Sequence, residues 1–152
     1  MQNDERAAAG ALSGPVRATA AGLGLGACAL LALAVWLPPD ARGLGTHQQL
    51  GLPPCSFRAL FGLPCPTCGM TTAWSCLMRG QVAAACRANL GGAALGATAI
   101  LAVPWLLAAA VAGRWLVVRP TAERVAWWLS AVTAAALAHW AWRLATGNVA
   151  AA

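Results

Sequence analysis

Three long apolar runs constrain the fold of this chain more than any other feature. They cover residues 18–37, 90–112 and 125–145, and each is close to the length of about 20 residues that a helix needs to cross a bilayer. Backbone groups inside a bilayer find no water to bond with, so spanning segments must satisfy them internally, as a helix does. We therefore expect an all-α membrane protein with three transmembrane helices.

The composition agrees with a membrane protein and argues against a soluble one. Charged residues make up 9% of the 152 residues and hydrophobic residues 60%, whereas a soluble domain carries about 25% charged residues. The apolar runs fit one membrane domain over residues 18–145, with a disordered tail at 1–17 and a second tail at 146–152. We expect a multi-pass protein whose main partner is the lipid bilayer.

The basic residues predict an orientation rather than a nucleic-acid partner. All ten are arginines, scattered among the apolar runs without the clustering that a nucleic-acid surface needs. Arg114, Arg119 and Arg124 fall in the short segment before the third run, and short loops rich in arginine stay in the cytoplasm. This orientation places residues 38–69, between the first two runs, on the extracytoplasmic side.

Two glycine motifs predict close helix packing. Gly22 and Gly26 form a Gly-x-x-x-Gly pattern in the first run, and Gly92 and Gly96 form another in the second. Such small residues allow two helix backbones to approach closely within a membrane. The helices that pack there belong to other membrane proteins, to a second copy, or to this chain itself.

The densest chemistry of the chain lies in residues 53–79. This segment holds Cys55 and a Cys-x-x-Cys motif at Cys65 and Cys68, in a loop rich in proline and glycine. Apolar residues then recur with helical spacing over 70–78. That helix is too short to span, so we expect it to lie in the membrane interface with its apolar face down. Its polar face should meet water and consists of Thr71, Thr72, Ser75 and Arg79.

The residues around these cysteines resemble a known family. The resemblance runs through Gly62-Leu-Pro-Cys65-Pro-Thr-Cys68-Gly-Met-Thr71 and reaches Arg87-Ala-Asn89, covering about residues 53–112. The family consists of small bacterial membrane proteins, catalogued as the domain of unknown function twenty-seven fifty-two. The resemblance implies a bacterial inner-membrane location and a site at the cysteines, without a biochemical activity. The chain departs from the family pattern at Thr72 (usually arginine), Gln81 (often aspartate) and Leu90 (often proline).

Three interpretations of the cysteines stay open. In the first, Cys55, Cys65 and Cys68 are thiolate ligands for a metal such as zinc or copper. The fourth ligand would then be His47, Cys76 or water. In the second, Cys55 forms a disulfide with one of the other two and ties down the loop. In the third, the Cys-x-x-Cys pair is redox-active.

Two functional hypotheses follow. The first is a metal- or thiol-binding module built on Cys55, Cys65 and Cys68, and the alternative is a structural membrane subunit. In the alternative, the cysteine loop is only tied by a disulfide, and the glycine-rich helices pack on partner proteins. Four acidic residues, without a nucleophilic triad or a phosphate loop, favour binding over enzymatic catalysis. Cys76 and Cys86 follow the helix start, so we expect both to lie outside the site.

The third apolar run carries polar and aromatic residues near its ends. His139 and Arg143 share one helix face. They form either an intramembrane polar site or side chains that reach from the helix end to the interface. Four tryptophans predict aromatic belts at the two membrane interfaces: Trp127, Trp128, Trp140 and Trp142.

Overall fold

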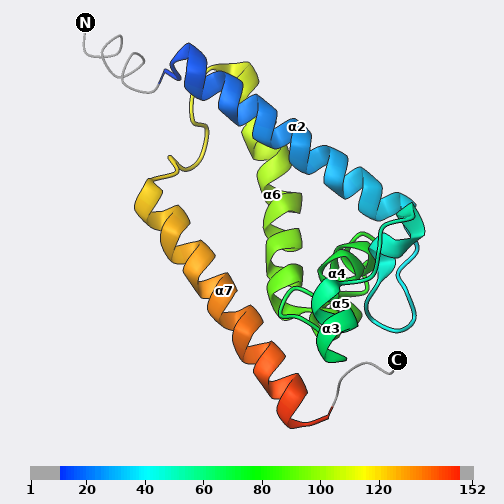
Figure 1. The fold of residues 1–152 in the computed structure, drawn as a ribbon. Coiled ribbons are helices and arrows are strands. Elements are labelled where there is room, and N and C mark those ends of the chain that lie inside the picture. Colours follow the sequence, from blue (N-terminus) through cyan, green and yellow to red (C-terminus); the bar gives the residue numbers. More distant parts are fainter. Residues whose placement is uncertain (1–10, 148–152) are drawn as a thin grey trace, which may run out of the picture.

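The computed structural model describes residues 11–147, and within that range the predicted all-α fold is confirmed (Figure 1). Extended pairing there is limited to an isolated bridge between Ala11 and Arg114. The long helices are α2 (Gly14–Trp36), α6 (Leu90–Ala112) and α7 (Ala122–Ala145). The short helices are η1 (Thr46–Leu50), α3 (Ser56–Phe61), α4 (Met70–Leu77) and α5 (Val82–Ala88).

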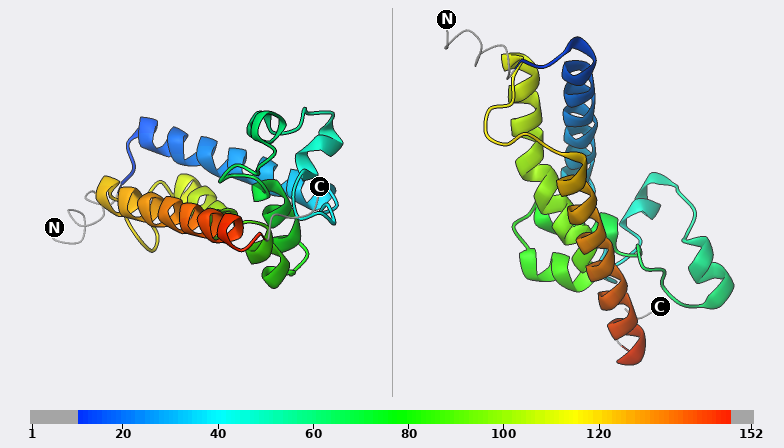
Figure 2. Two further views of the ribbon diagram at one scale, coloured as in Figure 1. Left: turned by 60° about the horizontal axis from the view of Figure 1, so that its bottom comes forward. Right: turned by 90° about the vertical axis from the view of Figure 1, so that its left-hand side faces the viewer.

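The antiparallel pair of α2 and α6 forms the centre of the fold (Figure 1). At one end of the pair, the backbone N–H of Leu12 donates to the carbonyl of Gly113 at 2.7 Å. Farther along, Gly24 allows close approach, since a Cβ there would lie 2.8 Å from Cδ2 of Leu107. The short helices gather at the other end (Figure 2). The cysteine segment is therefore held at the end of the long helices that lies opposite the connection between α6 and α7.

Two of the predicted apolar runs share boundaries with the observed helices: one at both ends and one at its C-terminal end. Helix α6 covers the predicted range 90–112, and α7 ends at the predicted residue. Helix α2 begins at Gly14, with proline in its first turn, so residues 14–17 of the predicted N-terminal tail are helical. Proline is compatible with a first turn because its missing N–H would have no helical partner there. The predicted tails at 1–10 and 148–152 lie outside the described residues.

Two of the three predicted spans are long and apolar enough to cross a membrane. These are α2 and α6, judged by length and composition. Helix α7 is as long but does not meet the same criterion. Its charged residues near both ends and its several tryptophans lower its mean hydropathy below that of α2 and α6. Most of its side chains are nevertheless exposed, and within it only Val132 and Arg143 are buried.

The long loop predicted at 38–69 contains two short helices, η1 and α3, which the sequence pattern did not reveal. Both have glycine at their C-terminal ends, Gly51 and Gly62, in the left-handed conformation that favours glycine. Such short helices carry too little periodicity for a pattern to identify. Their positions matter for function, since η1 carries His47 and α3 follows Cys55 directly.

The predicted polar face of the helix over 70–78 is exposed only in part. Thr71 and Arg79 are exposed, but Thr72 and Ser75 are 1% and 0% exposed, so the prediction that these two meet water is wrong. The Thr72 hydroxyl lies 2.8 Å from that of Thr46, in a buried hydrogen bond. On its apolar side, α4 packs against α6, where Gly92 and Gly96 leave room for it. The second glycine motif thus serves packing within the chain, and α4 is enclosed rather than laid on a surface.

Three arginines each donate to backbone carbonyls at the C-terminal end of another helix. Arg17 donates to Val111 near the end of α6, at 3.3 Å. Arg79 donates to Ala34 and Val35 near the end of α2, at 3.2 and 2.9 Å. The last carbonyls of a helix have no partner within it, and a cation there also favours the helix dipole. The third arginine, Arg143, donates to the carbonyl of Ala88 at the end of α5 at 3.0 Å. These three arginines therefore connect helix ends to other parts of the chain.

Candidate metal centre

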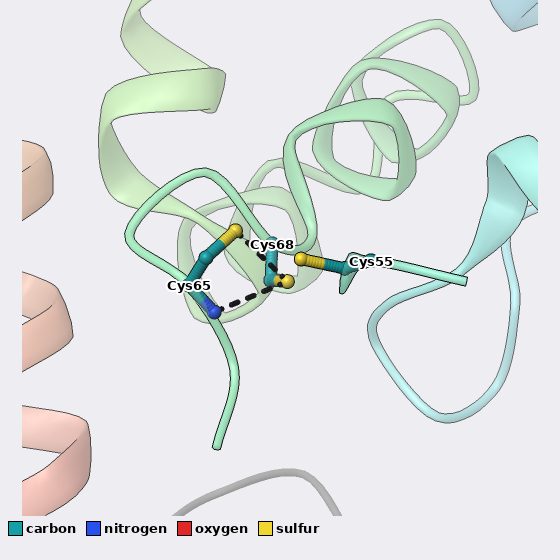
Figure 3. A group of neighbouring side chains, drawn as sticks. All are labelled: Cys55, Cys65 and Cys68. Carbon is teal, nitrogen blue, oxygen red and sulfur yellow. Dashed lines mark hydrogen bonds between the residues drawn. The ribbon is translucent and has the colours of Figure 1, made fainter. Parts of the chain in front are cut away.

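The three predicted cysteines converge, as the sequence indicates (Figure 3). The Sγ atoms of Cys55, Cys65 and Cys68 all lie within 4.8 Å of one another. The Sγ atoms of Cys65 and Cys68 are 3.1 Å apart, and the backbone N–H of Cys65 donates to the Cys68 sulfur at 3.3 Å. All six cysteines of the chain are free thiols. The geometry therefore brings together three free cysteine sulfurs from two separate turns.

A glycine forms the connection between the Cys-x-x-Cys turn and α4. Gly69 has a φ of +91°, a conformation that other residues rarely adopt. A Cβ at this position would lie 2.5 Å from the carbonyl oxygen of Ala88 and 2.9 Å from that of Gly43. The turn can therefore reach its place against α5 only with glycine at position 69.

Asn89 anchors the same turn from the junction between α5 and α6. Its side-chain amide donates to the carbonyls of Pro66 at 2.9 Å and Cys68 at 3.2 Å. Its carbonyl oxygen accepts from the backbone N–H of Gly92 at 2.7 Å, which caps the first turn of α6. Asparagine before an apolar helix predicts such a cap, but its bonds to the cysteine turn have no local signal in the sequence.

Helix α7 holds the cysteine loop from the other side. The indole N–H of Trp140 donates to the carbonyl of Pro64 at 2.7 Å, directly before Cys65. His139, the residue directly before Trp140, accepts from the backbone N–H of Leu90 at 3.4 Å, and Arg143, about one turn after Trp140, donates to Ala88 of α5. The polar residues of α7 therefore contact the cysteine loop, the start of α6 and the end of α5, which neither interpretation of the His139 and Arg143 pair anticipated.

The surroundings of the thiols shift the pKa values of Cys55 and Cys68 in opposite directions. The backbone N–H of Arg58, in the first turn of α3, lowers the pKa of Cys55, against the opposing effect of burial. Burial raises the pKa of Cys68 to about 12, and the adjacent Cys65 thiol adds to this effect. Cys55 therefore loses its proton more readily than Cys68. A bound cation would have to displace the Cys68 proton, as thiolate coordination requires.

The cysteines open into a cavity of about 330 Å³ whose wall also includes His47, Gln48 and Met70. His47 comes from η1, so an imidazole lines the same cavity as the three sulfurs. Among the fourth ligands left open by the sequence, His47 thus has access to the site. Its imidazole is not among the groups that lie within 4.8 Å of one another, so His47 would have to move toward the sulfurs to complete a four-ligand set.

The remaining cysteines lie outside this cavity. Cys76 is buried in an apolar cluster of α4, α5 and α6, and Cys86 packs against that cluster. Burial raises the pKa of Cys76, although Arg79 and Arg87 partly offset it. Cys28 is exposed on α2. The expectation that Cys76 and Cys86 stand apart from the trio is therefore confirmed.

Thr72, where the family pattern usually has arginine, also takes part in this region. Its buried hydrogen bond to Thr46 links the first turn of α4 to η1, the helix that carries His47. The backbone N–H of Asp40 donates to the same Thr46 hydroxyl at 3.1 Å. The departure from the family pattern thus coincides with a small polar contact that fits two threonines.

Comparison with known proteins gives a family and no nearer relative. No curated protein and no solved structure matches the chain. The family model that matches is described as "Protein of unknown function (DUF2752)", and it covers residues 55–111, from the first cysteine of the trio almost to the end of α6. The resemblance to this family is thereby confirmed: residues 55–111 of this chain match the DUF2752 family of proteins of unknown function.

Proposed function

We propose that this protein is a membrane-borne metal-binding module whose ligands are Cys55, Cys65 and Cys68. The observation that carries the proposal is the convergence of three free sulfurs within 4.8 Å, from two turns that other parts of the chain hold in place. Thiolates bind zinc and copper(I) strongly, and three of them around one cavity form most of a coordination sphere. His47 supplies the fourth ligand from the cavity wall.

The membrane arrangement that we propose has three spans, α2, α6 and α7. Helix α7 exposes an almost continuous apolar surface, and a bilayer would cover it. The loop that contains Arg114 and Arg119 is then cytoplasmic, and the metal centre faces the extracytoplasmic side of the bacterial inner membrane. Reporter fusions after Gly51 and after Gly113 test this orientation. A cytoplasmic signal at Gly51 with none at Gly113 would overturn it.

The metal proposal is tested by measuring metal content and free thiols on the same purified sample. The full chain, prepared in detergent with zinc or under reducing conditions with copper(I), should hold one metal per chain. All three site thiols should resist a thiol reagent until a chelator removes the metal. Cys65→Ser should lose most of the bound metal, while Cys86→Ser, the matched control from a partly buried position, should keep it. Equal metal retention in both variants would refute the proposal.

A structural subunit is the second candidate, and one observation favours it. A Cβ at Gly22 or Gly26 would have no neighbouring atom within 4 Å, so the first glycine motif is open on the surface of α2. Another membrane helix, from a partner protein or a second copy, could pack closely there. Size measurements on Gly22→Leu in detergent distinguish this function. A smaller particle with unchanged metal content would support the subunit, whereas an unchanged particle would contradict it.

A further inference from the structure

A second and larger cavity lies on the other side of α4 from the cysteines. It has a volume of about 640 Å³ and lies between residues 39–43, α5 and the C-terminal part of α7. The views of Figure 2 show α5 at the same end of the fold as that part of α7. The titratable residues of its wall are mainly basic, with two thiols and one acid: Asp40, Arg42, Arg87, His139, Arg143, Cys76 and Cys86.

The single carboxylate of this cavity is already neutralised. Asp40 pairs with Arg42 through both oxygens, with Nη2 to Oδ2 at 2.8 Å and Nε to Oδ1 at 3.0 Å. This pairing lowers the pKa of Asp40, so the pair stays ionised and carries no net charge. A divalent cation would therefore find neither a free carboxylate nor a negative cavity. Arg87 and Arg143 contribute the remaining formal charge of the wall.

Arg87 is an exposed cation of the cavity that, unlike Arg42, has no acidic partner among the described residues. Among residues 11–147 it makes no ion pair and no hydrogen bond. Arg143 is buried, and its Nη1 donates to the carbonyl of Ala88 at 3.0 Å, which fixes a second guanidinium in the wall. Guanidinium groups present several N–H donors in a plane that matches the oxygens of phosphate. A roomy basic cavity with one unpaired arginine and one anchored arginine is suited to an anion.

We propose that this cavity binds a phosphate group, and that the group belongs to the headgroup of an anionic phospholipid or to free inorganic phosphate. The position in the fold makes a headgroup accessible: the cavity lies beside α5 at the C-terminal part of α7, and its wall includes Trp142, an exposed aromatic side chain of the type found at membrane interfaces. Arg87 supplies a movable contact, and Arg143 supplies a fixed one. A bound phosphate would join α5 to α7. The cysteine centre is not required for this binding.

The test measures lipid binding to the full chain, purified in neutral detergent and stripped of lipid. Phosphatidylglycerol and the zwitterionic phosphatidylcholine are each added in mixed micelles, and inorganic phosphate is added in a third series. Bound stoichiometry is measured by native mass spectrometry and affinity by titration. We expect Arg87→Gln to weaken binding of the anion about tenfold, the size of one lost charge-assisted hydrogen bond. Arg119→Gln, in the connection at the opposite end of the fold, is the matched control and should bind like the wild type.

The three series distinguish the source of the phosphate. Saturable binding of phosphatidylglycerol that depends on Arg87 supports a lipid site, and binding of inorganic phosphate alone with the same dependence supports a site for the free ion. Equal affinity of wild type and Arg87→Gln for both anions would overturn the proposal, as would equal binding of phosphatidylcholine. Helix content by circular dichroism shows whether the variant is folded, and Arg87→Lys, which keeps the charge, should recover part of the affinity.

Discussion

Replacing Asn89 separates the two tasks that its side chain performs. Asn89→Ala removes the cap on Gly92 and both bonds to the cysteine turn. Asn89→Asp keeps an acceptor for Gly92, because aspartate is as good a cap as asparagine. It still loses both donors to Pro66 and Cys68. The two variants therefore share the loss of the bonds that hold the cysteine turn and differ in the cap.

The structure gives the size of each effect. The cap contributes about 1 kcal/mol, and each amide-to-carbonyl bond contributes about 1 kcal/mol net. Asn89→Ala should thus lower the free energy of unfolding by about 3 kcal/mol. Asn89→Asp should lower it by more than about 2 kcal/mol, because it also buries a carboxylate against the two carbonyl oxygens. The side chain is 2% exposed, so water cannot easily replace the lost bonds.

Metal affinity provides the readout that concerns function. If about 1.4 kcal/mol of the lost energy had served to order the cysteine turn, the affinity falls about tenfold. We expect this fall in both variants, measured by competition with a chelator of known affinity. Unfolding in mixed micelles gives the stability of the same samples. If Asn89→Asp bound metal as tightly as the wild type, the bonds to Pro66 and Cys68 would not position the site, and the reasoning would be refuted.

Three further predictions concern the same region. Gly69→Ala should destabilise the chain by more than about 2 kcal/mol, because the positive φ and the contact with Ala88 both oppose a Cβ. Gly62→Ala, at a position with positive φ but open space, should lower the stability less. Equal shifts of the melting temperature of the two variants in detergent would contradict this difference. Metal affinity should rise with pH toward the high pKa of Cys68, because metal binding releases the proton of this thiol. In the metal-free protein, the protonated Cys68 thiol stabilises the fold fully below pH 9.0, and this stabilisation is lost as the pH rises toward about 12. A pH-independent metal affinity would contradict the assignment of Cys68 as a ligand. Trp140→Phe should lower stability by about 1 kcal/mol and loosen Cys65, seen as faster thiol labelling of the metal-free protein, while Trp128→Phe should label at the wild-type rate.

The sequence predicts the long helices well because their signals are local. The run at 90–112 ends where the helix ends, since asparagine caps its start and a left-handed glycine follows it. The convergence of the three cysteines is also predictable. Only a short stretch separates Cys55 from Cys65, and closing a short loop costs little entropy.

Other features depend on contacts that no local pattern contains. The sequence pattern places Thr72 and Ser75 on a water-facing surface because both are polar, yet both are buried. Thr72 is buried with a hydrogen-bond partner, the hydroxyl of Thr46. The Ser75 hydroxyl has no partner among the described residues, and we have no physical account of its burial. Trp140 reads as part of an aromatic belt, but its N–H bonds a carbonyl in a loop 76 positions earlier. Such long-range bonds are set by the tertiary fold and leave no periodic trace in the sequence.

X-ray absorption at the edge of the bound metal tests the central proposal most directly. With zinc bound to the full chain, we expect a shell of three sulfurs at about 2.3 Å and one nitrogen at about 2.0 Å. His47→Ala should remove the imidazole signal and keep the sulfur shell, and Cys68→Ser should reduce the shell to two sulfurs. A metal surrounded by oxygen and nitrogen alone, or a wild-type sulfur shell in Cys68→Ser, would contradict a centre built on Cys55, Cys65 and Cys68.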